Sequence, residues 1–238
     1  MKIQERESVC LGLLRKFPQK FVLIGGYAAS SFDLPRFSVD LDLVIREKDV
    51  EEFSIILEEE GLKLITDAGH FAAFYKGRIM RFEKKVSALP VSVDLFVGMV
   101  QARQTDAVYS LEYLWKNSEI RRIVGSGVED YSEARAADRE MMIALKMNSM
   151  RMADQRDIIA LCNGKIDTGK ILHHLKRAPR EGILSNIAVI AATLERPESK
   201  DSIKGVFGIS DQVYKRIIEK AKREILSIRQ GLSERRNG

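Results

Sequence analysis

The stretch Phe21-Val22-Leu23-Ile24-Gly25-Gly26, followed at a distance by Asp40-Leu41-Asp42, decides the fold. Four apolar residues that stop at two glycines indicate a buried strand ending in a tight turn. We expect a short helix at residues 27–32 and a second strand at residues 39–45. Strand, turn, helix and strand in this order predict a mixed α/β core.

The rest of the chain divides into a strand-rich part and a helix-rich part. Residues 49–61 have helical periodicity, and residues 62–66, 71–75, 78–83 and 91–97 read as strands. After Gly125-Ser126-Gly127 strand signals disappear, and helices are expected at residues 138–150, 154–162, 168–175, 181–194 and 211–230. We therefore predict an α+β fold: a small mixed sheet with flanking helices in a domain of residues 1–127, and an α-helical domain of residues 128–238.

Bulk properties indicate a globular cytoplasmic protein of 238 residues without a membrane segment. No apolar run approaches the roughly 18 residues that span a bilayer. The charged start and the interruption at Arg15-Lys16 do not match a signal peptide. Cys10 and Cys162 lie far apart in helix-like sequence, which favours buried thiols over a disulfide framework.

Positive charge is concentrated in the helix-rich part. Residues 130–238 hold 21 Lys/Arg and 15 Asp/Glu, a net charge of +6, whereas the preceding residues carry −1. Such a surface could face RNA or nucleotide phosphates. The alternative is an ordinary solvated helix surface, which the lack of aromatic residues among the basic ones favours.

Asp40 and Asp42 carry the first sign of chemistry. Side chains alternate across a strand, so both carboxylates point to the same face while Leu41 points to the other. Two adjacent carboxylates repel each other, and Mg²⁺ relieves the repulsion because it takes hard oxygen ligands and bridges them to phosphates. The alternative is a wet strand whose acids face solvent.

Asp94 is the third acid, within the apolar run of residues 91–97. A lone carboxylate in such a strand needs a partner. If this strand lies beside that of Asp40 and Asp42, the three acids could hold two metal ions that activate a hydroxyl and neutralise a phosphoryl group.

Gly25-Gly26, then thirteen residues, then Asp40-Leu41-Asp42 and the later Asp94 resemble the signature of the polymerase-beta-like nucleotidyltransferases. Residues 36–42, Arg-Phe-Ser-Val-Asp-Leu-Asp, are similar to the form found in the branch of abortive-infection and type IV toxin nucleotidyltransferases. The helix at 138–146, which ends in Lys146, and the segment at 151–157 resemble later motifs of that branch. The resemblance covers roughly residues 21–161.

The resemblance implies a role for each matching residue. Gly25 and Gly26 would lie against the triphosphate. Many relatives have serine at the second glycine, so a hydroxyl contact to phosphate is either absent here or supplied by Ser30. Asp40, Asp42 and Asp94 would be the catalytic acids and the ligands of Mg²⁺ or Mn²⁺. Arg36 could contact phosphate or fix the Asp40 strand.

Four residues of the helical half remain open between function and structure. Lys146 would neutralise a phosphate of the NTP. Arg151, Asp154 and Asp157 are accessory candidates, since the two acids could orient Lys146 or Arg151 or assist the acceptor. The alternative is a helix N-cap at Asp154 and a surface ion pair of Asp157 with an arginine. His173 and His174 lack partners at zinc-ligand spacing and are expected on a helix surface.

These observations predict an enzyme that transfers a nucleoside monophosphate from an NTP to an acceptor hydroxyl. The toxin-like branch implies RNA, such as a tRNA 3′ end, or protein as the acceptor, and an antitoxin protein as a partner in a toxin–antitoxin pair. A small molecule such as an antibiotic is an alternative acceptor. The alternatives from other classes are a non-catalytic nucleotide-binding regulatory module and a helical RNA-binding protein.

Overall fold

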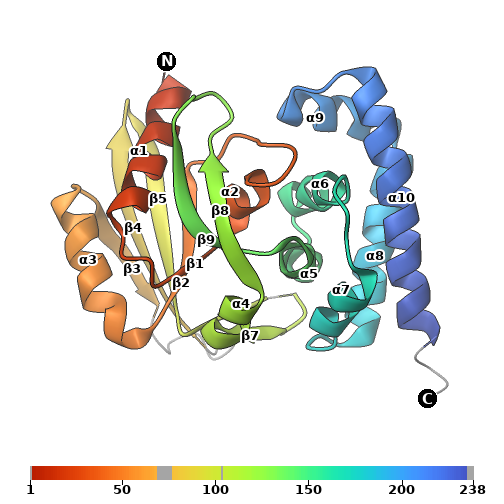
Figure 1. Cartoon of the computed structure of the whole chain (residues 1–238), viewed down its shortest axis with the longest axis horizontal. Coiled ribbons are helices and arrows are strands. Elements are labelled where there is room, and N and C mark those ends of the chain that lie inside the picture. The colour runs from red at the N-terminus through yellow and green to blue at the C-terminus, as the bar shows by residue number, and fades with distance from the viewer. Residues whose placement is uncertain (1, 69–76, 103, 235–238) are drawn as a thin grey trace. The chain divides into compact units, whose positions relative to one another are not determined.

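The computed structural model describes residues 2–68, 77–102 and 104–234, and the chain divides into two compact units (Figure 1). The sheet unit consists of Met1–Ser31, Pro35–Gln101 and Val108–Asp138. The helical unit consists of Phe32–Leu34, Ala102–Ala107 and Arg139–Gly238. The predicted α+β class, a mixed sheet with helices, is confirmed.

The sheet unit is built on one mixed sheet, which has seven strands within the described residues, in the order β3-β4-β5-β2-β1-β9-β8. The pairs β2–β5 and β1–β9 are parallel, and the other pairs are antiparallel. The strands are β1 (Val22–Ile24), β2 (Asp40–Ile45), β3 (Lys63–Ala68), β4 (Arg78–Val86), β5 (Leu89–Val97), β8 (Ser118–Val124) and β9 (Tyr131–Ala137). A separate small ribbon pairs β6 (Met99–Gln101) with β7 (Val108–Ser110).

Short helices flank this sheet. They are α1 (Lys2–Lys16), α2 (Gly25–Ser30), α3 (Val50–Glu59) after the 3-10 turn η1 (Glu47–Asp49), and α4 (Leu111–Lys116). In Figure 1, α1 lies across the sheet, where it contacts β9, β4 and β5. Phe17 stacks on Phe53 with ring centroids 5.0 Å apart, and Phe21 meets both rings edge-on. This aromatic cluster joins the end of α1 to α3 and β1.

Alternation along β2 and β5 separates an apolar face of the sheet from a polar one. The apolar face of β5 carries Val91, Val93 and Leu95, all buried, beside buried Leu41 and Leu43 of β2. Successive side chains of a strand point to opposite faces, so the residues between these positions form the other face. Core packing on one side therefore fixes which side chains the strands present on the other.

Strand β9 corrects the expectation that strand signals disappear after Gly125-Ser126-Gly127. Residues 131–137 form β9 inside the main sheet, and the sheet unit continues to Asp138. The buried positions of β9 hold Ser132, Ala134 and Ala136 in place of β-branched residues. Small residues carry little strand propensity, so pairing with β1 and β8 decides the conformation.

The helical unit contains α5 (Arg139–Ser149), α6 (Met152–Leu161), α7 (Thr168–Leu175), α8 (Arg180–Glu195), α9 (Pro197–Phe207) and α10 (Asp211–Glu234). The long helix α10 contacts α6, α7, α8 and α9. Its buried side chains recur every three or four residues, as one helix face requires, and they are Ile217, Ile218, Ala221, Ile225, Ile228 and Leu232. The expected helices are present, and α9 is an addition that begins at Pro197, ends at Phe207 and is followed by Gly208 in the left-handed conformation.

Three further expectations concern the cysteines, residues 71–75 and membrane segments. Cys10 and Cys162 are free and buried, as predicted, and burial raises the pKa of each thiol to about 12. The strand expected at residues 71–75 lies outside the described residues. Within the described part of the chain, no helix combines the length and apolarity needed to cross a bilayer.

Candidate active site

The polar face of the sheet brings three predicted acids together. Asp42 of β2 lies directly opposite Asp94 of β5, and Asp40 lies opposite Ser92. Residues opposite each other on neighbouring strands point to the same face, so Asp40, Asp42 and Asp94 share one face of the sheet. Asp40 is exposed, Asp42 is half-buried and Asp94 is only 7% exposed. These three acids, called the acid row below, extend from solvent at Asp40 to the buried Asp94.

The glycine turn at the end of β1 lies directly against this row. Gly25 has φ +74°, and a Cβ placed there would lie 1.8 Å from a carboxylate oxygen of Asp42. A Cβ on Gly26 would lie 2.5 Å from the Ser38 hydroxyl oxygen. Both distances are too short for a real side chain. Gly25 and Gly26 are therefore required by the approach of Asp42 and Ser38 to the start of α2.

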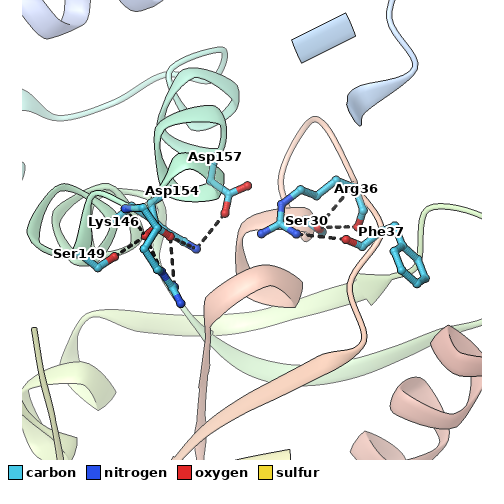
Figure 2. A network of polar contacts seen from close by, with 8 residues as sticks. Ser30, Arg36, Phe37, Lys146, Ser149, Asp154 and Asp157 are labelled. Atoms are coloured by element: carbon cyan, nitrogen blue, oxygen red, sulfur yellow. Dashed lines mark hydrogen bonds and ion pairs between the residues drawn. The ribbon is translucent and has the colours of Figure 1, made fainter. Parts of the chain in front are cut away.

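The loop before β2 is fastened by Ser30 and Arg36. The Ser30 hydroxyl is buried and is 3.2 Å from both the backbone N–H and the carbonyl oxygen of Arg36 (Figure 2). The Arg36 guanidinium donates a hydrogen bond of 3.1 Å to the carbonyl of Phe37. This geometry gives Ser30 a structural role and does not fit the phosphate contact that we expected of it. For Arg36 these contacts favour fixing the loop that enters β2.

Arg81 of β4 is the main feature that the sequence did not reveal. It lies directly opposite Asp94, on the side away from Asp42. Its Nε donates to Asp94 Oδ1 at 2.7 Å, and its Nη2 donates to Oδ2 at 2.6 Å. These hydrogen bonds, followed by the charges of Asp94, Asp40 and Glu83, outweigh burial and raise the pKa of Arg81 above its usual value. The partner that Asp94 requires inside its apolar strand is thus an arginine.

Some features of this polar face suit a divalent ion and others do not. The carboxylates supply the hard oxygen donors that Mg²⁺ takes. However, Arg81 binds both oxygens of Asp94, and Asp40 accepts a hydrogen bond from the Ser92 hydroxyl. Within the described residues, no group of three or more His, Cys, Asp or Glu side chains is placed to hold a metal ion. The predicted ligand set of Asp40, Asp42 and Asp94 therefore does not fit a metal in this arrangement.

In the helical unit, Lys146 lies in a buried ion network. Its ammonium contacts Asp154 Oδ1 at 2.9 Å and Asp157 Oδ2 at 2.8 Å, and Lys146 is only 4% exposed (Figure 2). Asp154 also accepts hydrogen bonds from the Ser149 hydroxyl, the Arg151 backbone N–H and the Arg151 guanidinium. Burial raises the pKa of Asp154, but Lys146 and the hydrogen bonds outweigh it and hold that pKa well below its usual value.

This network includes all four candidate residues of the helical half, Lys146, Arg151, Asp154 and Asp157. Two buried carboxylates already neutralise Lys146, so its ammonium does not match the phosphate-binding lysine that the resemblance implied. Asp154 is the third residue of α6 and not its N-cap, which is Arg151. Asp157 makes a buried ion pair with Lys146. Both acids contact Lys146, and these contacts connect α5 to α6.

The histidine pair also differs from expectation. His173 is exposed as predicted, but His174 is buried against the helical core. Desolvation, followed by the charges of Lys170 and His173, lowers the pKa of His174 to about 4. Leu172 and Leu175 of α7 are buried as well, so His174 lies on the apolar face of its helix.

Of the polar residues beside the acids that were not predicted, only Ser92 had a signal in the sequence. Ser92 stands two residues before Asp94, so alternation alone places it on the same face. Arg81 and Glu83 share the polar face of β4, but their positions opposite Asp94 and Ser92 follow from strand register. Register depends on how β4 and β5 pair, which the residues of β4 do not specify by themselves.

Comparison with known proteins supports the fold. No family model matches the sequence, and no curated protein matches it. The chain is similar to the solved structure of JHP933 from Helicobacter pylori, with a TM-score of 0.50 and 14% identity over 98% of this chain and 93% of that chain. A second Helicobacter pylori structure, described as a candidate nucleotidyltransferase, has a TM-score of 0.42 and 13% identity over 98% of this chain and 96% of that chain. At such identity, the likeness to JHP933 is one of fold, extending over nearly the whole of both chains.

Proposed function

We propose that this chain is a nucleotidyltransferase that moves a nucleoside monophosphate from an NTP to an acceptor hydroxyl. The observation that carries the proposal is the row of Asp42 and Asp94 on adjacent parallel strands, with Asp40 on the same face and the Gly25 turn against Asp42. Acids on a strand beside a tight glycine turn can place a triphosphate and an acceptor in one small space.

The reaction requires one bond to form and one to break. The acceptor oxygen bonds to the α-phosphorus of the NTP, the bond between that phosphorus and the bridging oxygen breaks, and pyrophosphate leaves. A carboxylate of the row takes the proton of the acceptor hydroxyl. Gly25 and Gly26, without side chains, allow phosphate oxygens to approach the backbone N–H groups of the turn.

The proposal includes a requirement for Mg²⁺ or Mn²⁺. Three carboxylates repel the four negative charges of an NTP, and a divalent ion bound with the nucleotide would offset that repulsion.

For the acceptor we favour RNA or a protein hydroxyl, in the manner of a toxin that has an antitoxin partner. The feature that supports this choice is the resemblance of residues 36–42 to the toxin branch. A small-molecule acceptor and a non-catalytic nucleotide-binding module are the alternatives.

The test is incubation of the purified chain with each α-labelled NTP, Mg²⁺ or Mn²⁺, and total cellular RNA or protein, followed by gel separation. We expect label in one acceptor fraction with one preferred NTP, and no label when the divalent ion is chelated. Label in neither fraction, together with pyrophosphate release when small hydroxyl compounds are supplied, would favour a small-molecule acceptor. Nucleotide binding without any transfer would favour the non-catalytic module.

A further inference from the structure

The strands β8 and β9 present a group of aromatic and charged side chains at the β8 end of the sheet. Opposite residues of an antiparallel pair point to the same side. On one side of this pair, which we call the β8–β9 face, the register brings together Ile120, Arg122 and Val124 of β8 with Arg135, Glu133 and Tyr131 of β9. Tyr131 is 46% exposed, and the residues that alternate with it along β9 are buried. The face is therefore open to solvent at an aromatic ring.

Two arginines of this face each lie over an aromatic ring. The guanidinium carbon of Arg122 is 4.0 Å from the centre of the Tyr131 ring, and that of Arg135 is 4.4 Å from the centre of the Trp115 ring. Trp115 is 39% exposed and belongs to α4, which contacts β8 at its beginning (Figure 1). Arg135 also donates a hydrogen bond of 3.1 Å to the carbonyl of Ser118. These contacts hold two rings and two guanidinium groups in place beside one another.

The β8–β9 face belongs to the same side of the sheet as the acid row. Ala136 of β9 lies opposite Leu23 of β1, which lies opposite Leu43 of β2. Leu43 is on the apolar face, so Ala136 is on it too, and the adjacent Arg135 points to the polar face. Only β1 separates β9 from β2. Because neighbouring strands are about 4.8 Å apart, β9 runs roughly 10 Å from the strand of Asp42.

The chemistry of this face fits unpaired nucleotides. Every base can stack on an aromatic ring or on a guanidinium plane, and arginine charges attract phosphates. Glu133 lies opposite Arg122 and offsets one of the two positive charges of the face, so phosphate attraction alone is weak here. A duplex keeps its bases stacked inside and binds mainly through its phosphates. Stacking on bases outside a duplex is therefore the interaction that this face favours.

We propose that the β8–β9 face, together with Trp115, binds a short stretch of unpaired nucleotides, of RNA or of DNA, on the side of the sheet that carries the acid row. Trp115 and Tyr131 stack on bases, while Arg122 and Arg135 add stacking surface and attract phosphates. This inference rests on the proposed function only where it makes the bound strand the acceptor, because binding itself requires no transfer.

The fluorescence of Trp115 tests this inference directly, because Trp115 is the single tryptophan of the chain. The full chain is titrated with a single-stranded RNA of roughly 12 nucleotides, a length within the usual site sizes. DNA of the same sequence and the same RNA annealed to its complement are titrated at the same ionic strength. We expect a single strand to quench the emission, because a base stacks on the indole ring, and the duplex to leave it unchanged at the same concentration. The single strand that binds more tightly identifies the source.

Variants at Tyr131 separate stacking from general attraction. Tyr131→Leu removes the ring and keeps apolar bulk, and its fold is checked by circular dichroism. We expect it to bind a fluorescently labelled strand at least about fivefold more weakly than wild type, since the loss of one stacked base weakens binding by that factor or more. Tyr131→Phe keeps the ring and should bind as tightly as wild type.

Arg122→Gln and Arg223→Gln form a matched pair. Each removes one exposed arginine, and Arg223 lies on α10, away from this face. Arg122→Gln should weaken binding of the strand, whereas Arg223→Gln should stay near the wild-type affinity. Equal losses in the two variants would show diffuse charge attraction and would overturn the site.

The remaining outcomes separate this inference from the proposed function. A strand that binds without changing the emission of Trp115, or equally tightly to folded Tyr131→Leu and wild type, would overturn the site. Quenching that follows the concentration of the protein alone would indicate a second copy on this face and would also overturn it. Nucleotide transfer to protein without binding of any single strand would overturn the inference and leave the transferase standing. Binding as predicted, without transfer to any acceptor, would support the inference and count against the transferase.

Discussion

Asp42 connects the acid row to the glycine turn, and its surroundings explain why two glycines precede it by a fixed distance. Gly25 must lack a side chain because the Asp42 carboxylate occupies the place of its Cβ. The sequence revealed this relation as a spacing of glycines and acids, because β1, the turn and β2 are neighbours in the chain. It did not reveal Arg81, whose position depends on pairing between β4 and β5.

At Gly25 we predict that Gly25→Ala destabilises the protein by at least about 2 kcal/mol, because strain at positive φ alone costs roughly 1–2 kcal/mol per residue. The displacement of Asp42 adds to that strain, so nucleotide transfer should fall as well. The measurement is urea unfolding at neutral pH. Gly61→Ala is the control, because Gly61 has φ +78° and nothing within 4 Å of a Cβ placed there. Equal losses for the two variants would show that contact with Asp42 contributes nothing.

At the scale of elements, the strongly patterned segments were predictable and the weakly patterned ones were not. The helices α3 and α10 and the strands β2 and β5 have clear apolar periodicity, and their predicted extents agree with the structure to within a few residues. Strand β9 holds Ser132, Ala134 and Ala136 at its buried positions, so neighbouring strands decide its conformation. The buried network around Lys146 joins the end of α5 to the first half of α6.

We predict that Lys146→Met lowers the free energy of unfolding by about 3–5 kcal/mol, because it removes the buried ammonium that contacts both Asp154 and Asp157. Urea unfolding measures this loss. Lys165→Met serves as the control, since Lys165 is exposed in the same unit and its replacement should change stability by no more than about 0.5 kcal/mol. A Lys146→Met protein of normal stability that binds NTP poorly would restore the phosphate-binding role.

On α7, we predict that His174 makes stability depend on pH between about 6.5 and 4. The folded-state pKa lies below the usual 6.5, at about 4, so as pH falls the unfolded chain takes up a proton that the folded protein refuses. The contribution of His174 is intact above pH 6.5, and the destabilisation grows to roughly 3 kcal/mol when pH reaches the folded pKa.

The measurement is urea unfolding at pH 7.5 and 4.5, chosen to lie at about the two ends of this range. His174→Gln should lose less stability between the two pH values than wild type does. His173→Gln changes the exposed neighbour and should behave as wild type. The same pH dependence in His174→Gln and wild type would show that other groups cause it.

For the whole molecule, the division into a sheet part and a helical part was visible in the sequence because the period of the apolar pattern changes from two to about 3.6. Which residues belong to each unit was less visible. Phe32–Leu34 and Ala102–Ala107 belong to the helical unit although they precede its helices in the chain. Short segments that cross between units carry no periodic signal, and only tertiary contacts assign them.

The central claim concerns the chemistry of the whole molecule and is that Asp42 acts on an NTP. The most direct measurement is pyrophosphate release from the NTP in the presence of Mg²⁺ and of the acceptor fraction, RNA or protein, that takes up label. The proteins compared are wild type, Asp42→Asn and the control Asp67→Asn. Asp67 is also an aspartate in the sheet, but it pairs with Arg78 outside the acid row. We predict release by wild type and Asp67→Asn, and a loss of roughly a hundredfold or more in Asp42→Asn. Equal release by folded Asp42→Asn and wild type would contradict the account.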